Sequence, residues 1–397
     1  MEKGLLDGIV VLDLTRVLAG PYCGMLLADM GATVYKVEIP GHVDDSRAYG
    51  PFQKGESVYY MNFNRGKIGC TLNMKKPEGK ELFKEMVKKA DVVLENYRPG
   101  TMDKLGLGYD VLKEVNPGIV YAAVSGFGRT GPYSRRAGYD IIGQAMGGLM
   151  STTGWPGGQP TRTGTPMGDV LGGLNVTIGI LAALINKAKT GEGELVDVSL
   201  VDAVVSSMTN INMIYLATGR IPERIGNRYE STYPYDSFRT KDGSVIIGAG
   251  NDKLYDILCD VMQMPELKTD PRFLAVKDRV ANHVAMKEII EKWTMEKTID
   301  EVADALNSAG VPASPINTID RVVADKHIGG VHNMFPEMDH PVAGKVKVTN
   351  NPLKFGHKQA FPRMPAPTLG QDNEEVYGKF LGKDEATIKT LKENGVI

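Results

Sequence analysis

The residue best suited to covalent chemistry is Asp169, which lies between a stretch rich in glycine and proline and a long apolar stretch. Gly168 precedes it, and Gly172 and Gly173 follow within about one helical turn. An aspartate at such a junction can cap the helix by accepting hydrogen bonds from the first backbone N–H groups. The same place can hold an ionised carboxylate as a nucleophile, with glycines that let a bulky substrate approach. The residues alone leave both interpretations open.

Other chemical motifs are weaker. The segment 126–131 reads GFGRTG after a predicted strand, but Pro132 and the residues after it do not begin a helix. A dinucleotide site needs a helix N-terminus there to hold the pyrophosphate, so NAD binding is disfavoured. The three cysteines form no CxxC pair and the six histidines are scattered. We therefore expect no metal site and no tightly bound cofactor.

Composition excludes several classes of protein. The chain has 397 residues, with 46 basic and 48 acidic side chains, and so lacks the positive excess of a nucleic-acid-binding protein. The first residues do not resemble a signal peptide. The longest apolar stretch, 170–185, is shorter than the ~20 residues that span a bilayer. We expect a cytoplasmic enzyme with no nucleic-acid or membrane partner.

The N-terminal third alternates between strand and helix patterns, which predicts a parallel sheet and a Rossmann-like α/β fold. The expected strands are 8–14, 32–38, 70–73, 91–95 and 119–125, and the expected helices are 21–30 and 76–89. Residues 126–168 are predicted as a long loop, and residues 169–189 and 199–218 as two long helices.

The sequence pattern changes near residue 222. From there it predicts a strand hairpin with Asp242-Gly243 at its turn, followed by helices. Short strands, turns and a last helix follow residue 330. We therefore predict a large Rossmann-like domain formed by 1–221 and 330–397, with a smaller α+β domain, 222–329, inserted between these segments.

Several motifs resemble those of class III CoA-transferases of the CaiB/BaiF type, the family of the formyl-CoA and carnitine CoA-transferases. They occur in family order over nearly the whole chain: LLDGIVVLDLTRVLAGPYCGMLLADMGATVYKVE (5–38), NRGK (64–67), LN (72–73), ENYRPG (95–100), SGFG (125–128), GYD (138–140), GD (168–169), GEGE (191–194) and GAGND (248–252).

The resemblance implies that Asp169 is the nucleophile. Coenzyme A would pass from an acyl-CoA donor to a small carboxylic acid through an aspartyl-acyl anhydride and an aspartyl-CoA thioester. Coenzyme A thioesters would thus be substrates, and the protein would be an interlocked homodimer. The donor and acceptor acyl groups do not follow from the sequence.

The same resemblance assigns residues to the site. Those implied to contact coenzyme A are Arg16, Val17, Ala19, Leu72, Lys75, Asn96, Tyr97, Arg98 and Lys104. Basic side chains suit its phosphates. Tyr139 corresponds to an active-site aromatic residue, and Gly248, Gly250 and Asn251 to a mobile glycine loop over the acyl-aspartyl intermediate.

A 2-methylacyl-CoA racemase of the same superfamily is the alternative. Racemization requires a base that removes the α-proton, and those relatives carry histidine where this chain has Tyr139. A tyrosine, with an ordinary pKa of about 10, is a poor base near neutral pH. The sequence therefore favours the transferase.

Overall fold

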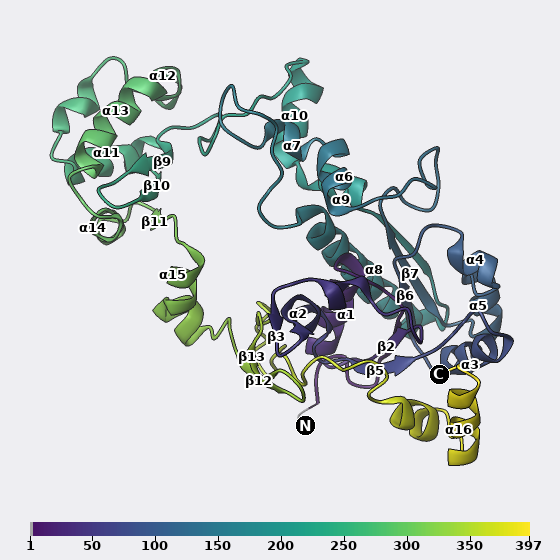
Figure 1. The fold of residues 1–397 in the computed structure, drawn as a ribbon. Coiled ribbons are helices and arrows are strands. Elements are labelled where there is room, and N and C mark those ends of the chain that lie inside the picture. The colour runs from purple at the N-terminus through teal and green to yellow at the C-terminus, as the bar shows by residue number, and fades with distance from the viewer. Residues whose placement is uncertain (1–2) are drawn as a thin grey trace. The chain divides into compact units, whose positions relative to one another are not determined.

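The computed structural model describes residues 3–397. The chain divides into two compact units, which are described separately (Figure 1). The first unit contains the N-terminal residues up to 149 together with 162–218 and 326–397, and the second contains 150–161 and 219–325.

A parallel sheet of six strands is the centre of the first unit. Its order is β5 (Ile68–Thr71), β2 (Thr33–Glu38), β1 (Val10–Asp13), β6 (Val92–Glu95), β7 (Val120–Ser125), β8 (Leu195–Ser199). The chain thus runs outward from β1 in one direction and then, from β6, in the other, as in doubly wound α/β folds. The predicted α/β class with a parallel sheet is confirmed.

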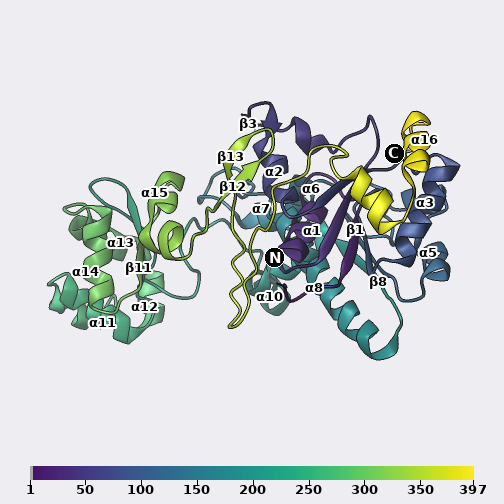
Figure 2. The same cartoon turned by 90° about the horizontal axis from the view of Figure 1, so that it is seen from below.

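Alternating strand residues supply the two cores of this unit. Val11 and Val92 pack with α1 (Ala19–Asp29) and α8 (Met167–Thr190). Leu12 and Val93 pack with α3 (Pro77–Lys88) and α5 (Tyr109–Val115). The two helix layers are visible on either side of the sheet in Figure 2. The apolar runs in the sequence are nearly continuous because both faces of the sheet are buried.

Two expectations about secondary structure are wrong. The predicted helix 199–218 is two helices, α9 (Leu200–Ser207) and α10 (Thr209–Thr218), bent by 75° where Thr209 adopts φ 40°. The predicted loop 126–168 contains α6 (Asp140–Met146) and α7 (Leu149–Thr152). Glycine-rich composition concealed these short helices, because glycine lowers helix propensity without forbidding a helix that tertiary contacts stabilise.

Helix α8 is long and apolar enough to cross a membrane by length and composition. A core helix of a soluble protein meets the same criteria, and Val176 and Ile180 are fully buried in the core beside the sheet. Other side chains of α8 are exposed: Ile178 by 64% and Ile185 by 61%.

The second unit has its own small core. Strands β9 (Tyr235–Arg239), β10 (Ser244–Gly248) and β11 (Ala313–Pro315) form an antiparallel sheet. The predicted hairpin with a turn at Asp242-Gly243 is present as β9 and β10. The short segment 150–161 also belongs to this unit, which the sequence analysis did not foresee. The domain boundaries at 221 and 330 stay a prediction.

The other elements complete the chain. In the second unit they are η2 (Pro265–Thr269), α11 (Asp252–Val261), α12 (Val276–Ala281), α13 (His283–Thr294), α14 (Ile299–Ser308) and α15 (Ile319–Ala324). In the first unit they are η1 (Asp45–Ala48), β3 (Phe52–Gln53), β4 (Glu56–Ser57), α2 (Val58–Asn64), α4 (Thr101–Leu105), η3 (Lys326–Val331), β12 (Glu337–His340), β13 (Gly344–Lys347), η4 (Glu374–Phe380) and α16 (Glu385–Glu393).

Candidate active site

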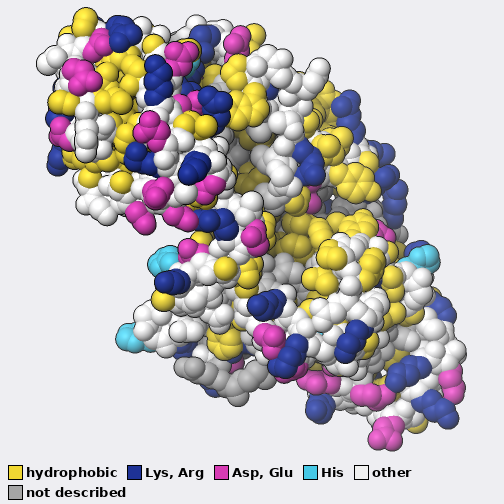
Figure 3. Space-filling model, turned by 60° about the vertical axis from the view of Figure 1, so that its left-hand side comes forward, with side chains coloured by type: hydrophobic (Ala, Val, Ile, Leu, Met, Phe, Trp, Pro, Cys, Tyr) yellow, Lys and Arg dark blue, Asp and Glu magenta, His cyan; other side chains and the backbone are white. Residues whose placement is uncertain are grey.

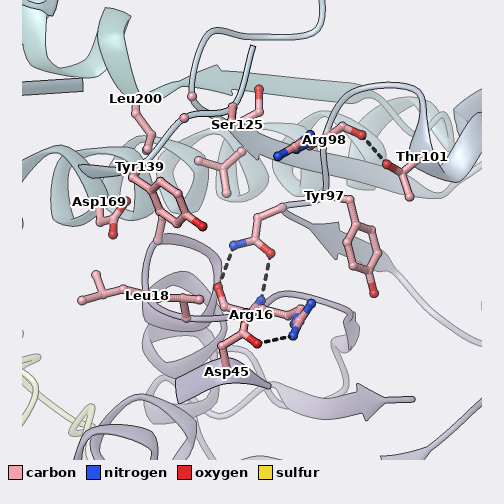
Figure 4. A pocket seen from close by; sticks show the side chains of 17 residues that line it. Arg16, Leu18, Asp45, Tyr97, Arg98, Thr101, Ser125, Tyr139, Asp169 and Leu200 are labelled. Carbon is pink, nitrogen blue, oxygen red and sulfur yellow. Dashed lines mark hydrogen bonds and ion pairs between the residues drawn. The ribbon is translucent and has the colours of Figure 1, made fainter. Parts of the chain in front are cut away.

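A pocket of about 380 Å³ opens where strands β1, β6 and β7 end. Its walls come from the segments that follow these strands, together with Tyr139 and Asp169 (Figure 4). The strand order reverses between β1 and β6, and in doubly wound folds ligands bind beyond the carboxyl ends of the strands at this point. The fold therefore supplies a binding crevice here before any side chain is considered.

Asp169 is the third residue of α8, which begins at Met167 after Pro166. Its carboxylate has no hydrogen-bond or ion-pair partner among residues 3–397, so the interpretation of Asp169 as a cap is wrong. Burial, and then the nearby charge of Asp140, raise its pKa to about 7. The sequence predicts that the helix end holds Asp169 ionised, but burial outweighs the effect of the helix dipole on this pKa.

The loop after β1 is held by Asn96. The side-chain oxygen of Asn96 accepts a hydrogen bond from Arg16 N–H at 2.8 Å, and its amide group donates to the Arg16 carbonyl at 2.7 Å. Asn96 therefore pairs with the backbone of Arg16 as a neighbouring strand would. Asn96 thus positions a segment that lines the pocket, and its predicted contact with coenzyme A stays a prediction.

Buried charges hold the next residue of the same loop. Val17 has φ 69°, a conformation that costs a branched side chain free energy. Its N–H donates to Asp44 at 3.0 Å, and Asp44 pairs with Lys36 at 2.9 Å, with both side chains fully buried. Burial alone would raise the pKa of Asp44, but Lys36 and the backbone donors hold that pKa well below its ordinary value. The network therefore keeps the loop fixed and Asp44 ionised.

Two cationic side chains reach this pocket. Arg16 donates to Asp45 at 2.7 Å and to the carbonyl of Val43 at 3.1 Å, while its Nε is buried without a partner. Arg98 is exposed, and its guanidinium has no partner among residues 3–397. The pocket thus combines an unpaired carboxylate with positive charge suited to a phosphate or carboxylate ligand.

Tyr139 lies beside Asp169 in Figure 4. Its side chain is 69% exposed, so the opening of the pocket carries an unpacked aromatic ring. Tyr97 lines this pocket and also a smaller adjoining one of about 150 Å³, which contains Lys75 and the main part of the Arg16 loop. The predicted residues Arg16, Val17, Ala19, Asn96, Tyr97, Arg98, Tyr139 and Asp169 are therefore brought together, with Lys75 next to them.

Five of the predicted residues line neither of these two pockets. Leu72 is fully buried in the core against α3, so its side chain offers no surface to a ligand. Lys104 is exposed on α4 and does not line the pocket. Gly248, Gly250 and Asn251 belong to the second unit, and their part in the site stays a prediction.

Asp140 and Asp44 support the site although neither was predicted as a site residue. Asp140 accepts hydrogen bonds from the first turn of α8, and Asp44 holds the Val17 loop. Asp140 could have been noticed as an acidic residue directly after Tyr139 in a quoted motif. Nothing in the spacing of Asp44 indicates that it reaches back 27 residues to Val17.

Comparison with known proteins identifies the family of the chain. The model of CoA-transferase family III matches residues 6–373. The chain is 41% identical to acetyl-CoA:oxalate CoA-transferase of Acetobacter aceti, covering 96% of this chain and 97% of the relative. It is 38% identical to human succinyl-CoA:glutarate CoA-transferase, covering 99% and 90% respectively.

Solved structures give the same result. A CaiB/BaiF family protein from Brucella suis superposes with a TM-score of 0.85 at 37% identity, covering 95% of this chain and 100% of that structure. The family match over nearly the whole chain, the named relatives and the shared fold establish that this chain belongs to CoA-transferase family III.

Proposed function

We propose that the protein transfers coenzyme A from an acyl-CoA donor to a carboxylic acid, with Asp169 as the covalent nucleophile. The observation that carries the proposal is the unpaired Asp169 carboxylate in a pocket at the switch point of the sheet. A structural aspartate in a partly buried place normally has hydrogen-bond partners, because desolvation of a carboxylate is costly. A reactive one must be open to its substrate.

The proposed reaction has four steps, and in each a nucleophile attacks an acyl carbon and displaces a thiolate or a carboxylate. Asp169 attacks the donor thioester and gives an acyl-aspartyl anhydride and the thiolate of coenzyme A. The thiolate attacks the aspartyl carbonyl, which forms an aspartyl-CoA thioester and releases the donor acid as its carboxylate. The acceptor carboxylate then attacks this thioester, forming a second anhydride and releasing the thiolate again. Attack of that thiolate on the acceptor carbonyl gives the new acyl-CoA and regenerates Asp169.

Each step passes through an oxyanion that needs hydrogen-bond donors, each worth roughly 3 kcal/mol of barrier. We propose that the loop containing Gly248, Gly250 and Asn251 supplies such a donor and excludes water, which would hydrolyse the anhydride. Arg16, Lys75 and Arg98 would bind the phosphates of coenzyme A, with Tyr97 beside its chain. Tyr139 would contact the acyl group next to Asp169.

The acceptor class is proposed from the relatives. Those named above act with oxalate or glutarate, both dicarboxylic acids. We therefore propose a small dicarboxylic acid as acceptor.

We also propose a homodimer. Both α8 and α10 of the first unit carry large exposed apolar side chains: Ile178, Ile185, Met213, Tyr215 and Leu216 are each more than half exposed. In the space-filling view, hydrophobic side chains also form surface patches among the charged ones (Figure 3). Large exposed apolar side chains of this kind are typical of a protein–protein interface.

The test is a mass-spectrometric transfer assay with acetyl-CoA or succinyl-CoA and a panel of mono- and dicarboxylic acids. We expect a new acyl-CoA with at least one dicarboxylic acid. Asp169→Asn should abolish transfer while binding coenzyme A within a few-fold of the wild type. Asp202→Asn, which changes an aspartate in the first turn of α9, is the matched control and should retain transfer.

A parallel reaction in D₂O addresses the racemase alternative. A racemase must introduce deuterium at the α-carbon of a 2-methylacyl-CoA, whereas attack by Asp169 at the thioester carbon leaves the α-proton untouched. Deuterium incorporation at the rate of turnover, with no transfer to any acid, would overturn the proposal.

A further inference from the structure

The first turn of α8 is capped from another helix. One carboxylate oxygen of Asp140, the first residue of α6, accepts hydrogen bonds from the backbone N–H of Gly168 at 2.8 Å and of Asp169 at 3.4 Å. These are donors that a helix leaves free at its N-terminus. Asp140 thus takes the place that a local capping side chain would occupy.

Asp140 is itself held in place. Its other oxygen accepts from the side-chain amide of Gln144 at 2.8 Å, and Gln144 is fully buried. The Gln144 carbonyl oxygen in turn accepts from the N–H of Thr163 at 3.0 Å and from its hydroxyl at 3.2 Å. One buried amide therefore connects the Asp140 carboxylate to the segment that leads into α8.

The residue before α8 completes this arrangement. An acidic side chain at the third helical position commonly turns back to the N–H of the capping residue. Here that residue is Pro166, which has no N–H. With Pro166 lacking a donor and Asp140 occupying the N–H groups of Gly168 and Asp169, the Asp169 carboxylate has no local partner to capture it.

We propose that Asp140 is a positioning residue for the transfer reaction, which caps α8 in place of Asp169 and so leaves the Asp169 carboxylate free to attack the thioester. This inference rests on the proposed role of Asp169 as nucleophile. Asp140 touches neither thioester nor acceptor in this scheme, and it acts only through Asp169 and the first turn of α8.

The charge of Asp140 has a second effect. After burial, it is the cause that raises the pKa of Asp169. The other titratable or charged groups around Asp169 are Tyr59 on α2, Tyr139 before α6, Arg16 after β1, Asp45 on η1 and Arg98 after β6. From α1 and α9 the pocket receives only the uncharged Ala19 and Leu200. Among these groups Asp140 alone both hydrogen-bonds the first turn of α8 and carries a like charge.

Two substitutions separate these effects. Asp140→Asn keeps an oxygen that can cap α8 but removes the charge, whereas Asp140→Ala removes both. Asp110→Asn and Asp110→Ala, in the first turn of α5 and away from the pocket, are matched controls. The measurement is the single-turnover rate at which Asp169 is labelled by the donor acyl-CoA that supports transfer, followed by peptide mass spectrometry from pH 5 to 9.

We expect Asp140→Ala to label Asp169 at least tenfold more slowly while its affinity for coenzyme A changes by less than threefold. In Asp140→Asn, Asp169 should be labelled at a rate nearer to that of the wild type. The pH at which this rate falls to half on the acidic side should be lower by about one unit. A purely structural role would lower the melting temperature without changing this pH.

The outcomes distinguish the inference from the proposed function. If the wild type is not labelled at Asp169 by an active donor, the proposed function fails. If the wild type is labelled, and folded Asp140→Ala is labelled equally fast or the rate in folded Asp140→Asn falls to half at the same pH as in the wild type, the inference fails and the nucleophile stands. The Asn variant keeps the test decisive if the Ala variant does not fold.

Discussion

Removing the charge of the proposed nucleophile should stabilise the protein, and more so at high pH. The pKa of Asp169 rises from an ordinary 3.8 to about 7 in the folded chain, chiefly through burial. The pKa of Asp169 is higher in the folded chain than in the unfolded chain. The contribution of this carboxyl group to the free energy of unfolding is therefore complete below pH 3.8 and is lost as the pH rises through about 7. Above pH 7 the folded protein holds an ionised carboxylate in a place that disfavours it.

The size of the effect follows from the shift. Roughly three pH units at about 1.4 kcal/mol each give an upper bound of about 4 kcal/mol. Asp169 is partly exposed, so solvent screening reduces this to roughly 2 kcal/mol. Asp169→Asn should therefore gain about this much stability over the wild type between pH 4.5 and pH 8.

The assay is urea unfolding of both proteins at the two pH values, followed by far-ultraviolet circular dichroism, which reports the helices and strands of the first unit as well as the second. Comparing two pH values cancels any constant cost of placing an amide at this position. Asp202→Asn, which also changes an aspartate in a first helical turn, should show no such trend. A stability difference that is equal at both pH values, or that shrinks with rising pH, would refute the reasoning.

Three further predictions concern the frame of the site. Asn96→Ala removes two hydrogen bonds to the Arg16 backbone and should cost about 2 kcal/mol of stability and raise the KM for acyl-CoA several-fold; an unchanged KM would contradict the positioning role. Lys36→Met strands the buried Asp44 carboxylate and should cost about 3–5 kcal/mol in urea unfolding, with part recovered in the double variant with Asp44→Asn; no recovery would argue against a coupled pair. Differently tagged dimers should exchange subunits only over many hours at nanomolar concentration if the chains interlock, and exchange within minutes by native mass spectrometry would exclude interlocking.

The sheet could be predicted from the sequence because its signal is local. Buried parallel strands are short apolar runs, and the amphipathic pattern of 76–89 corresponds closely to α3 (Pro77–Lys88). The bend at Thr209 could not be predicted, because the apolar pattern continues across it. Helices α6 and α7 were concealed by the glycines around them.

In the candidate site, too, some features could be predicted from the sequence and others could not. Asp169 was identified from its place between glycines and from family motifs, and the pocket around it contains most of the predicted residues. The hydrogen bonds of Asn96 to the Arg16 backbone were not predicted, because a motif shows that a residue matters but not which atoms it contacts. Asp140 and Asp44 act through contacts 28 and 27 residues apart, which no spacing rule anticipates.

The most direct test of the account is to identify the residue that carries the covalent intermediate. The protein is incubated with an active donor acyl-CoA, treated with hydroxylamine or borohydride, and digested for peptide mass spectrometry. The account predicts one modification, on Asp169, within the peptide region 163–186, and none in Asp169→Asn. An adduct on a glutamate or another aspartate, or no adduct with a donor that supports transfer, would contradict it.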